Sequence, residues 1–202
     1  VQRAPGLFPA IKHAVDRDRT PGRFLLTGSS NVLALPTLSE SLAGRMEVCT
    51  LWPLAQAELE STGGGMVDRL FASGAFPPSG RTAPAEGLDV WDRVLRGGFP
   101  EAVGRRSPEH RRAWFEAYVD TILQRDILDL SRIDRLAEMP RLLQLLAART
   151  SGLLSYADLA SGLSMPASTL KRYVTLLEAV FLVRMLPAWT SGLSGRVVKS
   201  PK

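Results

Sequence analysis

The chain has 202 residues, of which 45% are hydrophobic and 22% are charged. A chain of this length and balance can bury one or two hydrophobic cores, so we do not expect extensive disorder. Its cysteine and histidine content, Cys49 with His13 and His110, excludes an intrachain disulfide and predicts no metal site built from histidines and thiolates.

The formal net charge of +5 comes mainly from arginines in the middle and C-terminal parts of the chain. Such a balance permits contact with nucleic acid, although solvated surface charge is the commoner reason for it. No apolar run approaches the roughly 18 residues that cross a bilayer, and the N-terminus lacks the order of a signal peptide. We therefore expect a cytoplasmic protein without membrane contact. Because the sequence starts at Val1 and stops in an unfinished segment, 197–202, we also expect an internal piece of a longer protein.

The N-terminal part begins with the pattern of an α/β unit. Residues 7–17 predict a helix, since Leu7, Ile11 and Val15 recur at a spacing of four. Residues 23–27 (RFLLT) form a short apolar run that predicts a buried strand.

Small polar residues follow this run, in the order Gly28, Ser29 and Ser30. A second β-like run covers residues 46–51, and a further helix is predicted at residues 56–60. The order predicts a parallel sheet, and such sheets bind their ligands at the carboxyl ends of the strands.

Glycines and prolines mark the predicted breaks in the rest of the chain. Residues 61–87 contain three successive glycines and a Pro-Pro pair, which predicts a loop at a domain boundary. The pattern is helical beyond residue 91, with an interruption at residues 96–100 (RGGFP) where one helix must end before another begins. Residues 140–149 predict a largely buried leucine-rich helix.

The region after residue 151 has the proportions of a helix-turn-helix. Ser155 and Asp158 form a predicted capping box for a short helix, 156–161, which we expect to end at Gly162. Ser164 is predicted to cap a second helix.

The second helix has an apolar face and a polar face. Its apolar face carries Leu170, Val174 and Leu177, and its polar face carries Ser168, Lys171, Arg172 and Thr175. Small polar and basic groups are those that a recognition helix presents to phosphates and base edges, so Ser168, Lys171 and Arg172 are the candidate DNA-binding residues. A helix-turn-helix that serves only as a packing unit or a protein interface is an equally weighted alternative, because two cations make a weak electrostatic footprint.

A wing is predicted beyond the second helix. Residues 180–186 are β-like, and residues 187–195 followed by 196–199 can fold back on them. The whole C-terminal region therefore predicts a winged helix.

Four stretches of the sequence carry a family resemblance: RFLLTGSS, SESLAGRMEVCTLWPLAQAEL, RGGFPEAV and YADLASGLSMPASTLKRYVTLLEAVFLVRMLP. In this order they resemble the prokaryotic ATP-binding proteins that join an AAA+ type core, a P-loop NTPase, to the domain of unknown function 4143. The resemblance implies an α/β remnant of a P-loop ATPase core, followed by a mostly α-helical region with a winged helix-turn-helix. It divides the chain into the C-terminal part of the ATPase core (1–62), a linker with a helical lid-like domain (63–150) and a winged-helix domain (151–202).

The resemblance also implies roles for individual residues. LLTGSS corresponds to the segment called sensor 1, so Ser29 or Ser30 would hydrogen-bond the γ-phosphate or the attacking water. Arg45, in SLAGR, would be an arginine finger or a nucleotide sensor, because a guanidinium spreads its charge over two phosphate oxygens. The alternative for Arg45 is a salt bridge to a carboxylate such as Glu40.

One departure from the family decides what we expect of this chain alone. It contains no G-x-x-x-x-G-K-[ST] loop and no Gly-Lys pair, so the phosphate cradle, its lysine and the magnesium-binding hydroxyl are missing. We expect ATP and Mg²⁺ to bind the longer parent protein, no tight cofactor binding by this chain, and no ATP hydrolysis by it.

The leading interpretation is therefore a piece of an ATPase that couples nucleotide state to a winged helix, with DNA, a protein partner or a further copy as candidate partners. A DNA-binding regulator that needs no ATP is the alternative. Hydrolysis by the carboxylates of Asp126 and Asp129 is a third idea, but Arg125 and Arg132 are close in sequence, so we expect these aspartates to be ion-paired surface groups.

Overall fold

The computed structural model describes residues 6–31, 42–61, 71–72, 90–130, 136–189 and 201. It contains two compact units, one formed by Val1–Glu47 with Tyr118–Lys202 and the other by Val48–Ala117. The domain boundaries that we place after residues 62 and 150 stay predictions.

The described elements are all helical. In chain order they are α1 (Leu7–Arg17), α3 (Gln56–Leu59), α5 (Val90–Arg96), α6 (Pro100–Val103), α7 (Pro108–Thr121), the π-helical turn η2 (Ile122–Asp126), α8 (Ile127–Leu130), the 3-10 turn η3 (Leu136–Glu138), α9 (Met139–Ala147), α10 (Tyr156–Leu163) and α11 (Ala167–Ala179).

The predicted α/β remnant of a P-loop ATPase core is wrong for the described part of the chain, where no strand is present. Residues 23–27, 46–51 and 183–186 have no regular secondary structure, and Leu25 is 89% exposed. Apolar runs become strands only when a neighbouring strand satisfies their backbone groups and buries one face. None of these runs has such a neighbour among the described residues. The predicted strand of the wing at residues 180–186 is wrong for the same reason, and residues 190–199 of the predicted wing lie outside the described residues.

The N-terminal helix is confirmed over residues 7–17. Its buried face differs from the predicted one, because Phe8 is buried beside Ile11 while Leu7 is exposed. Phe8 and Ile11 pack with Leu42, and three half-buried side chains, Val15, Leu26 and Met46, complete this small cluster.

Helices α10 and α11 confirm the predicted helix pair. Ser155 caps α10, since its Oγ accepts a hydrogen bond from the Asp158 N–H at 3.3 Å. The predicted helix end at Gly162 is wrong, because α10 continues through Leu163.

Ser164 ends α10 instead of capping α11, where Pro166 takes the N-cap position. Ser164 adopts a left-handed conformation with φ 50° and ψ 43°. Its N–H donates to the Ser161 carbonyl, and the Met165 N–H donates to the Ala160 carbonyl. These two bonds form a Schellman motif, which satisfies carbonyls at the end of α10 and turns the chain sharply into α11.

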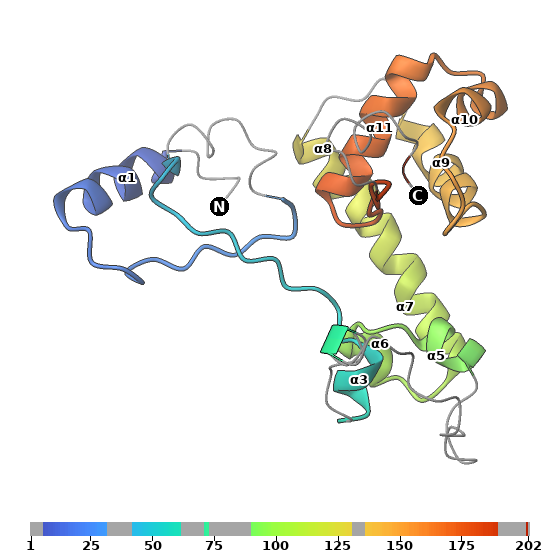
Figure 1. The fold of residues 1–202 in the computed structure, drawn as a ribbon, viewed down its shortest axis with the longest axis horizontal. Coiled ribbons are helices and arrows are strands. Elements are labelled where there is room, and N and C mark those ends of the chain that lie inside the picture. Colours follow the sequence, from blue (N-terminus) through green and yellow to red (C-terminus); the bar gives the residue numbers. More distant parts are fainter. Residues whose placement is uncertain are drawn as a thin grey trace. The chain divides into compact units, whose positions relative to one another are not determined.

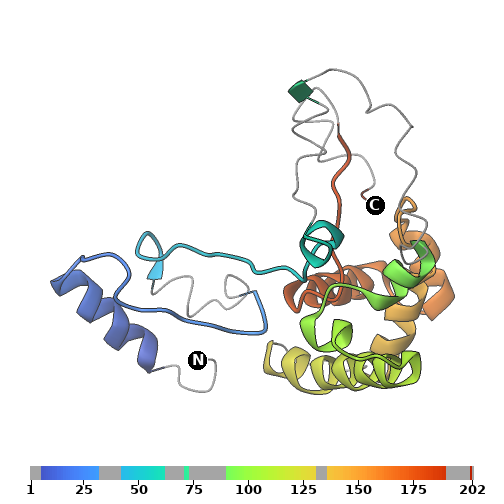
Figure 2. The same cartoon turned by 90° about the horizontal axis from the view of Figure 1, so that it is seen from below.

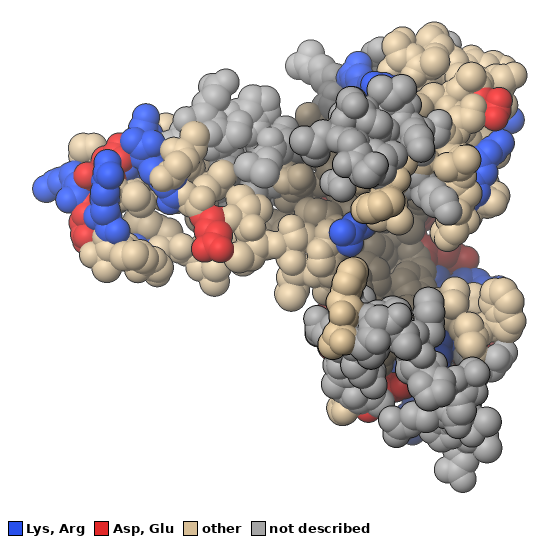
Figure 3. Space-filling model, in the orientation of Figure 1, with Lys and Arg blue, Asp and Glu red and all other residues tan. Residues whose placement is uncertain are grey.

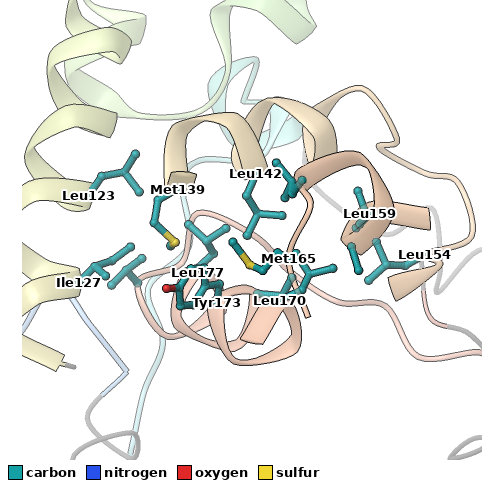
Figure 4. Packing of buried hydrophobic residues seen from close by; sticks show 14 of the residues in the cluster. Leu123, Ile127, Met139, Leu142, Leu154, Leu159, Met165, Leu170, Tyr173 and Leu177 are labelled. Atoms are coloured by element: carbon teal, nitrogen blue, oxygen red, sulfur yellow. The ribbon is translucent and has the colours of Figure 1, made fainter. Parts of the chain in front are cut away.

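The main hydrophobic core lies between the C-terminal helices. Helices α9, α10 and α11 lie together in Figure 1, and their orange and red ribbons stay together in the turned view of Figure 2. Figure 4 shows their buried side chains converging on one another. The buried members of this cluster are Ile122, Leu123, Ile127, Met139, Leu142, Leu154, Leu159, Ala160, Leu163, Met165, Leu170, Tyr173, Val174, Leu177 and Val180.

The second unit is organised around the RGGFP turn. Gly97 has φ +65°, which ends α5, and Pro100 starts α6. The Leu54 N–H donates to the Gly98 carbonyl at 2.8 Å, and a Cβ on Gly98 would stand 2.0 Å from the Leu54 carbonyl oxygen. Gly98 is therefore needed because two backbone segments meet there. The Phe99 ring packs on Trp114 and Phe115 of α7.

Replacing Ser164 with glycine should stabilise the first unit, because glycine adopts φ 50° without the steric cost that serine has. We expect the free energy of unfolding to rise by about 0.5–1 kcal/mol, measured by urea denaturation followed by circular dichroism. The matched control is Ser161→Gly, an exposed position inside α10, which should lower the same free energy by about 0.5 kcal/mol. A lower free energy of unfolding in both variants would contradict the role of the left-handed conformation at Ser164.

Replacing Gly98 with alanine should destabilise the second unit, because the added methyl overlaps the Leu54 carbonyl. We expect a loss of about 1–3 kcal/mol, measured by urea denaturation with tryptophan fluorescence, since Trp52, Trp91 and Trp114 belong to this unit. Gly104→Ala is the control, because Gly104 has helical φ and its added Cβ would make only an ordinary contact at 3.4 Å. Equal losses would show that the close approach does not matter.

Candidate functional site

The segment after Gly28 is attached to the end of α11. Ser29 is exposed and Ser30 is buried. The Asn31 N–H donates to the Ala179 carbonyl oxygen at 2.7 Å. Because Ala179 is the last residue of α11, this bond joins the Gly-Ser segment to one end of the helix pair α10–α11.

Arg45 is presented by a tight turn over residues 42–45. The Arg45 N–H donates to the Leu42 carbonyl at 3.0 Å, and Gly44 has φ +69°. This left-handed conformation favours glycine and lets the chain reverse directly before the arginine. Leu42 anchors the turn, since its side chain is buried against α1.

The Arg45 guanidinium forms a two-pronged ion pair with Asp16, in the last turn of α1. Its Nε donates to Asp16 Oδ1 at 2.7 Å, and its Nη2 donates to Asp16 Oδ2 at 3.2 Å. The remaining nitrogen, Nη1, donates to the Ala43 carbonyl at 3.1 Å. All three guanidinium nitrogens are therefore engaged. The predicted alternative partner, Glu40, lies outside the described residues.

The pair remains charged across the physiological pH range. The hydrogen bond from Arg45 lowers the pKa of the Asp16 carboxyl below its ordinary value, against a smaller opposing effect of burial. The same bond raises the pKa of Arg45. The two side chains are 32% and 36% exposed, for arginine and aspartate respectively, so solvent screens their attraction.

Sequence reasoning missed Asp16. Its position at the polar end of α1 is visible in the sequence, but the pair joins residues 29 positions apart. Only the turn at residues 42–45 brings the two side chains together.

The polar face of α11 lies on the surface as predicted. Ser168, Lys171, Arg172 and Thr175 are exposed, whereas Leu170, Val174 and Leu177 are buried. Thr175 Oγ1 donates to the Lys171 carbonyl at 3.1 Å, so this hydroxyl is partly engaged with its own helix. The DNA-binding role of these residues stays a prediction.

Asp126 is not the ion-paired surface group that we expected. It is 8% exposed and closes the π-helical turn η2, between the core residues Leu123 and Ile127. Its carboxylate forms no ion pair with another described residue. Burial raises the pKa of Tyr118, and the negative charge of Asp126 adds a smaller effect in the same direction. The side chain of Asp129 and the whole of Arg132 lie outside the description.

The described residues contain neither a metal-binding cluster nor a membrane-spanning helix. No group of three histidine, cysteine, aspartate or glutamate side chains there has a spacing that fits a metal ion. None of the described helices is both long enough and apolar enough to cross a membrane.

The chain is similar, to the same degree, to two curated proteins. They are Uncharacterized protein Rv2008c of Mycobacterium tuberculosis and Uncharacterized protein Mb2031c of Mycobacterium bovis, each 34% identical over 201 residues. Each comparison covers 100% of this chain and 40% of the relative, so the chain spans two fifths of the length of these proteins. No solved structure matches the chain.

Two protein families match different parts of the sequence. Residues 1–60 match the family described as AAA domain, which makes this an AAA-like, P-loop ATPase-related region. Residues 87–202 match the family described as Domain of unknown function (DUF8612), which corrects the expected domain of unknown function 4143. Because this second match covers more than half of the sequence, the chain belongs to the DUF8612 family, with an AAA-like region at its N-terminus.

Proposed function

We propose that this chain is part of an AAA+ type ATP-binding protein that couples nucleotide state to its C-terminal helix pair. The observation that carries the proposal is the match of residues 1–60 to the AAA domain family. Both sequence elements that we associate with nucleotide, LTGSS and SLAGR, fall inside this stretch.

The residues present can contact a bound nucleotide but do not suffice to hold one. Ser29 offers an exposed hydroxyl to a γ-phosphate or an attacking water, whereas Ser30 is buried, and Arg45 offers a guanidinium that stabilises phosphate charge. The chain has no glycine-lysine phosphate loop, which would supply the phosphate cradle and the magnesium-binding hydroxyl. ATP and Mg²⁺ therefore belong to the longer parent protein, and this chain alone does not hydrolyse ATP.

The route of coupling is the bond between Asn31 and Ala179. A shift of the Gly-Ser turn on nucleotide binding would act directly on the end of α11, because the 2.7 Å bond joins the two backbones. Coupling between two sites needs an element with two states that both sites bias, and the segment at residues 28–31 together with the end of α11 is the element that we propose for it.

The test uses a protein extended upstream to include its phosphate-binding loop. Calorimetry with an ATP analogue should detect tight binding to the extended protein and no tight binding to the 202-residue chain. In an ATPase assay, Arg45→Ala should lower turnover of the extended protein by about 10³-fold, because the guanidinium stabilises charge on the transferred phosphate.

Arg23→Ala is the matched control for Arg45→Ala. Arg23 also pairs with an aspartate of the same region, Asp18, at 3.2 Å, yet it has no proposed role toward phosphate. Equal losses in the two variants, or no ATP binding by the extended protein, would contradict the proposal.

DNA binding without ATP is the second candidate function, because α11 exposes Ser168, Lys171 and Arg172 on one face. If this face contacts a duplex, the double variant Lys171→Ala/Arg172→Ala should bind more weakly. The slope of log affinity against log salt should fall by about 2 in magnitude, from about 0.9 for each lost phosphate contact. Fluorescence anisotropy with a 20-base-pair duplex, without nucleotide, measures both effects.

The control variant Arg105→Ala/Arg106→Ala removes the same charge from exposed positions in the second unit. An equal loss of affinity in this control would show that only net charge matters. Absence of DNA binding in the unaltered chain would leave a protein partner or a further copy as the candidate partner of the helix pair.

A further inference from the structure

The carboxylate of Asp16 occupies one edge of the Arg45 guanidinium. Arg45 approaches it with Nε and Nη2, the edge that matches two oxygens of either a carboxylate or a phosphate. A phosphate group that displaced the carboxylate would therefore find the same two donors.

Two further cations, Lys12 and Arg19, act on the Asp16 carboxylate. Lys12 lies four residues before Asp16, on the same face of α1, and Arg19 follows three residues after it. The charges of both act on the Asp16 carboxylate, in addition to that of Arg45. Figure 3 shows blue basic atoms and red acidic atoms side by side over α1.

We propose that Lys12, Arg19 and Arg45 form a binding site for a phosphate group, and that Asp16 is a positioning residue that occupies the site while no phosphate is bound. The inference rests on the proposed function, in which Arg45 acts on phosphate. It adds the residue that holds Arg45 beforehand and the cations that assist it.

Two properties make the exchange of partner favourable. The pair is about one-third exposed, so it is screened and opens at little cost. A pyrophosphate or nucleotide phosphate also carries more negative charge than one carboxylate, and so attracts the three cations more strongly. A purely structural pair that ties α1 to the turn at residues 42–45 would show no such exchange.

The neighbouring pair of Asp18 and Arg23 provides a matched comparison. Arg23 Nη1 lies 3.2 Å from Asp18 Oδ2 and also donates to the Ala14 and Asp18 carbonyls. Asp18→Asn therefore removes the same charge, two residues away, without releasing Arg45.

The experiment measures pyrophosphate binding to the complete 202-residue chain by calorimetry at low salt. We expect Asp16→Asn to bind pyrophosphate about two- to fivefold more tightly than Asp18→Asn, the gain that follows from removing one exposed competing pair. The gain should vanish in the double variant Asp16→Asn/Arg45→Ala. Asp16→Glu, which keeps a carboxylate, should retain the affinity of the unaltered chain.

Three results would overturn the proposal: equal affinities of Asp16→Asn and Asp18→Asn, a gain that persists without Arg45, or no pyrophosphate binding by either single variant. A chain that passes this test while the extended protein fails to bind ATP would retain the phosphate site and lose the ATPase proposal. If instead the extended protein turns over ATP but Asp16→Asn and Asp18→Asn bind pyrophosphate equally, the ATPase proposal stands and the phosphate site is lost.

A second measurement uses the unaltered chain and does not depend on the folding of a variant. Carbon-13 NMR of the Asp16 carboxyl follows its pKa, which the Arg45 hydrogen bond holds below the ordinary value. If pyrophosphate takes Arg45 from Asp16, this pKa should rise toward its ordinary value, and the pKa of Asp18 should move less. A pKa of Asp16 that stays unchanged in pyrophosphate overturns the exchange.

Discussion

Burial of one face of α11 is the constraint on which the described C-terminal structure depends. Leu170, Tyr173, Val174 and Leu177 are all buried, and they form the part of the core that α10 and α9 cover. Each such side chain contributes roughly 1.5–3 kcal/mol when it leaves water. This burial fixes the rotation of α11 and so directs Ser168 and Lys171 to the surface.

Burial of α11 also fixes the position of the backbone group that bonds to the N-terminal region. Because α11 is held along its length, its last carbonyl, that of Ala179, has a defined position. The Asn31 N–H finds its acceptor there, so an anchor for the Gly-Ser turn comes from the C-terminal part of the sequence. This contact is short and specific, whereas the Arg45–Asp16 pair is charged and exposed. The hydrogen bond between Asn31 and Ala179 suits a permanent attachment. The exposed Arg45–Asp16 pair suits an interaction that can change partner.

The predicted strands that the described residues lack share one physical cause. Residues 23–27 and 46–51 have the apolar content of strands, but a strand depends on neighbours that are remote in sequence. Helices satisfy their own backbone hydrogen bonds, so α1 and α10 could be predicted from local spacing and capping. The end of α10 was missed because a serine, Ser164, takes the left-handed position that is usually glycine's.

The sequence by itself determined the helix at residues 7–17, the helix pair with its two faces, the break at RGGFP and the absence of a phosphate-binding loop. These follow from periodicity, from caps and from residues that are simply present or missing. Only the tertiary structure decided that Arg45 pairs with Asp16, that Asn31 bonds to Ala179, that Asp126 is buried and that Leu54 leaves no room for a side chain at Gly98. Each of these depends on where the packing of apolar side chains brings distant segments together, and no local pattern carries that information.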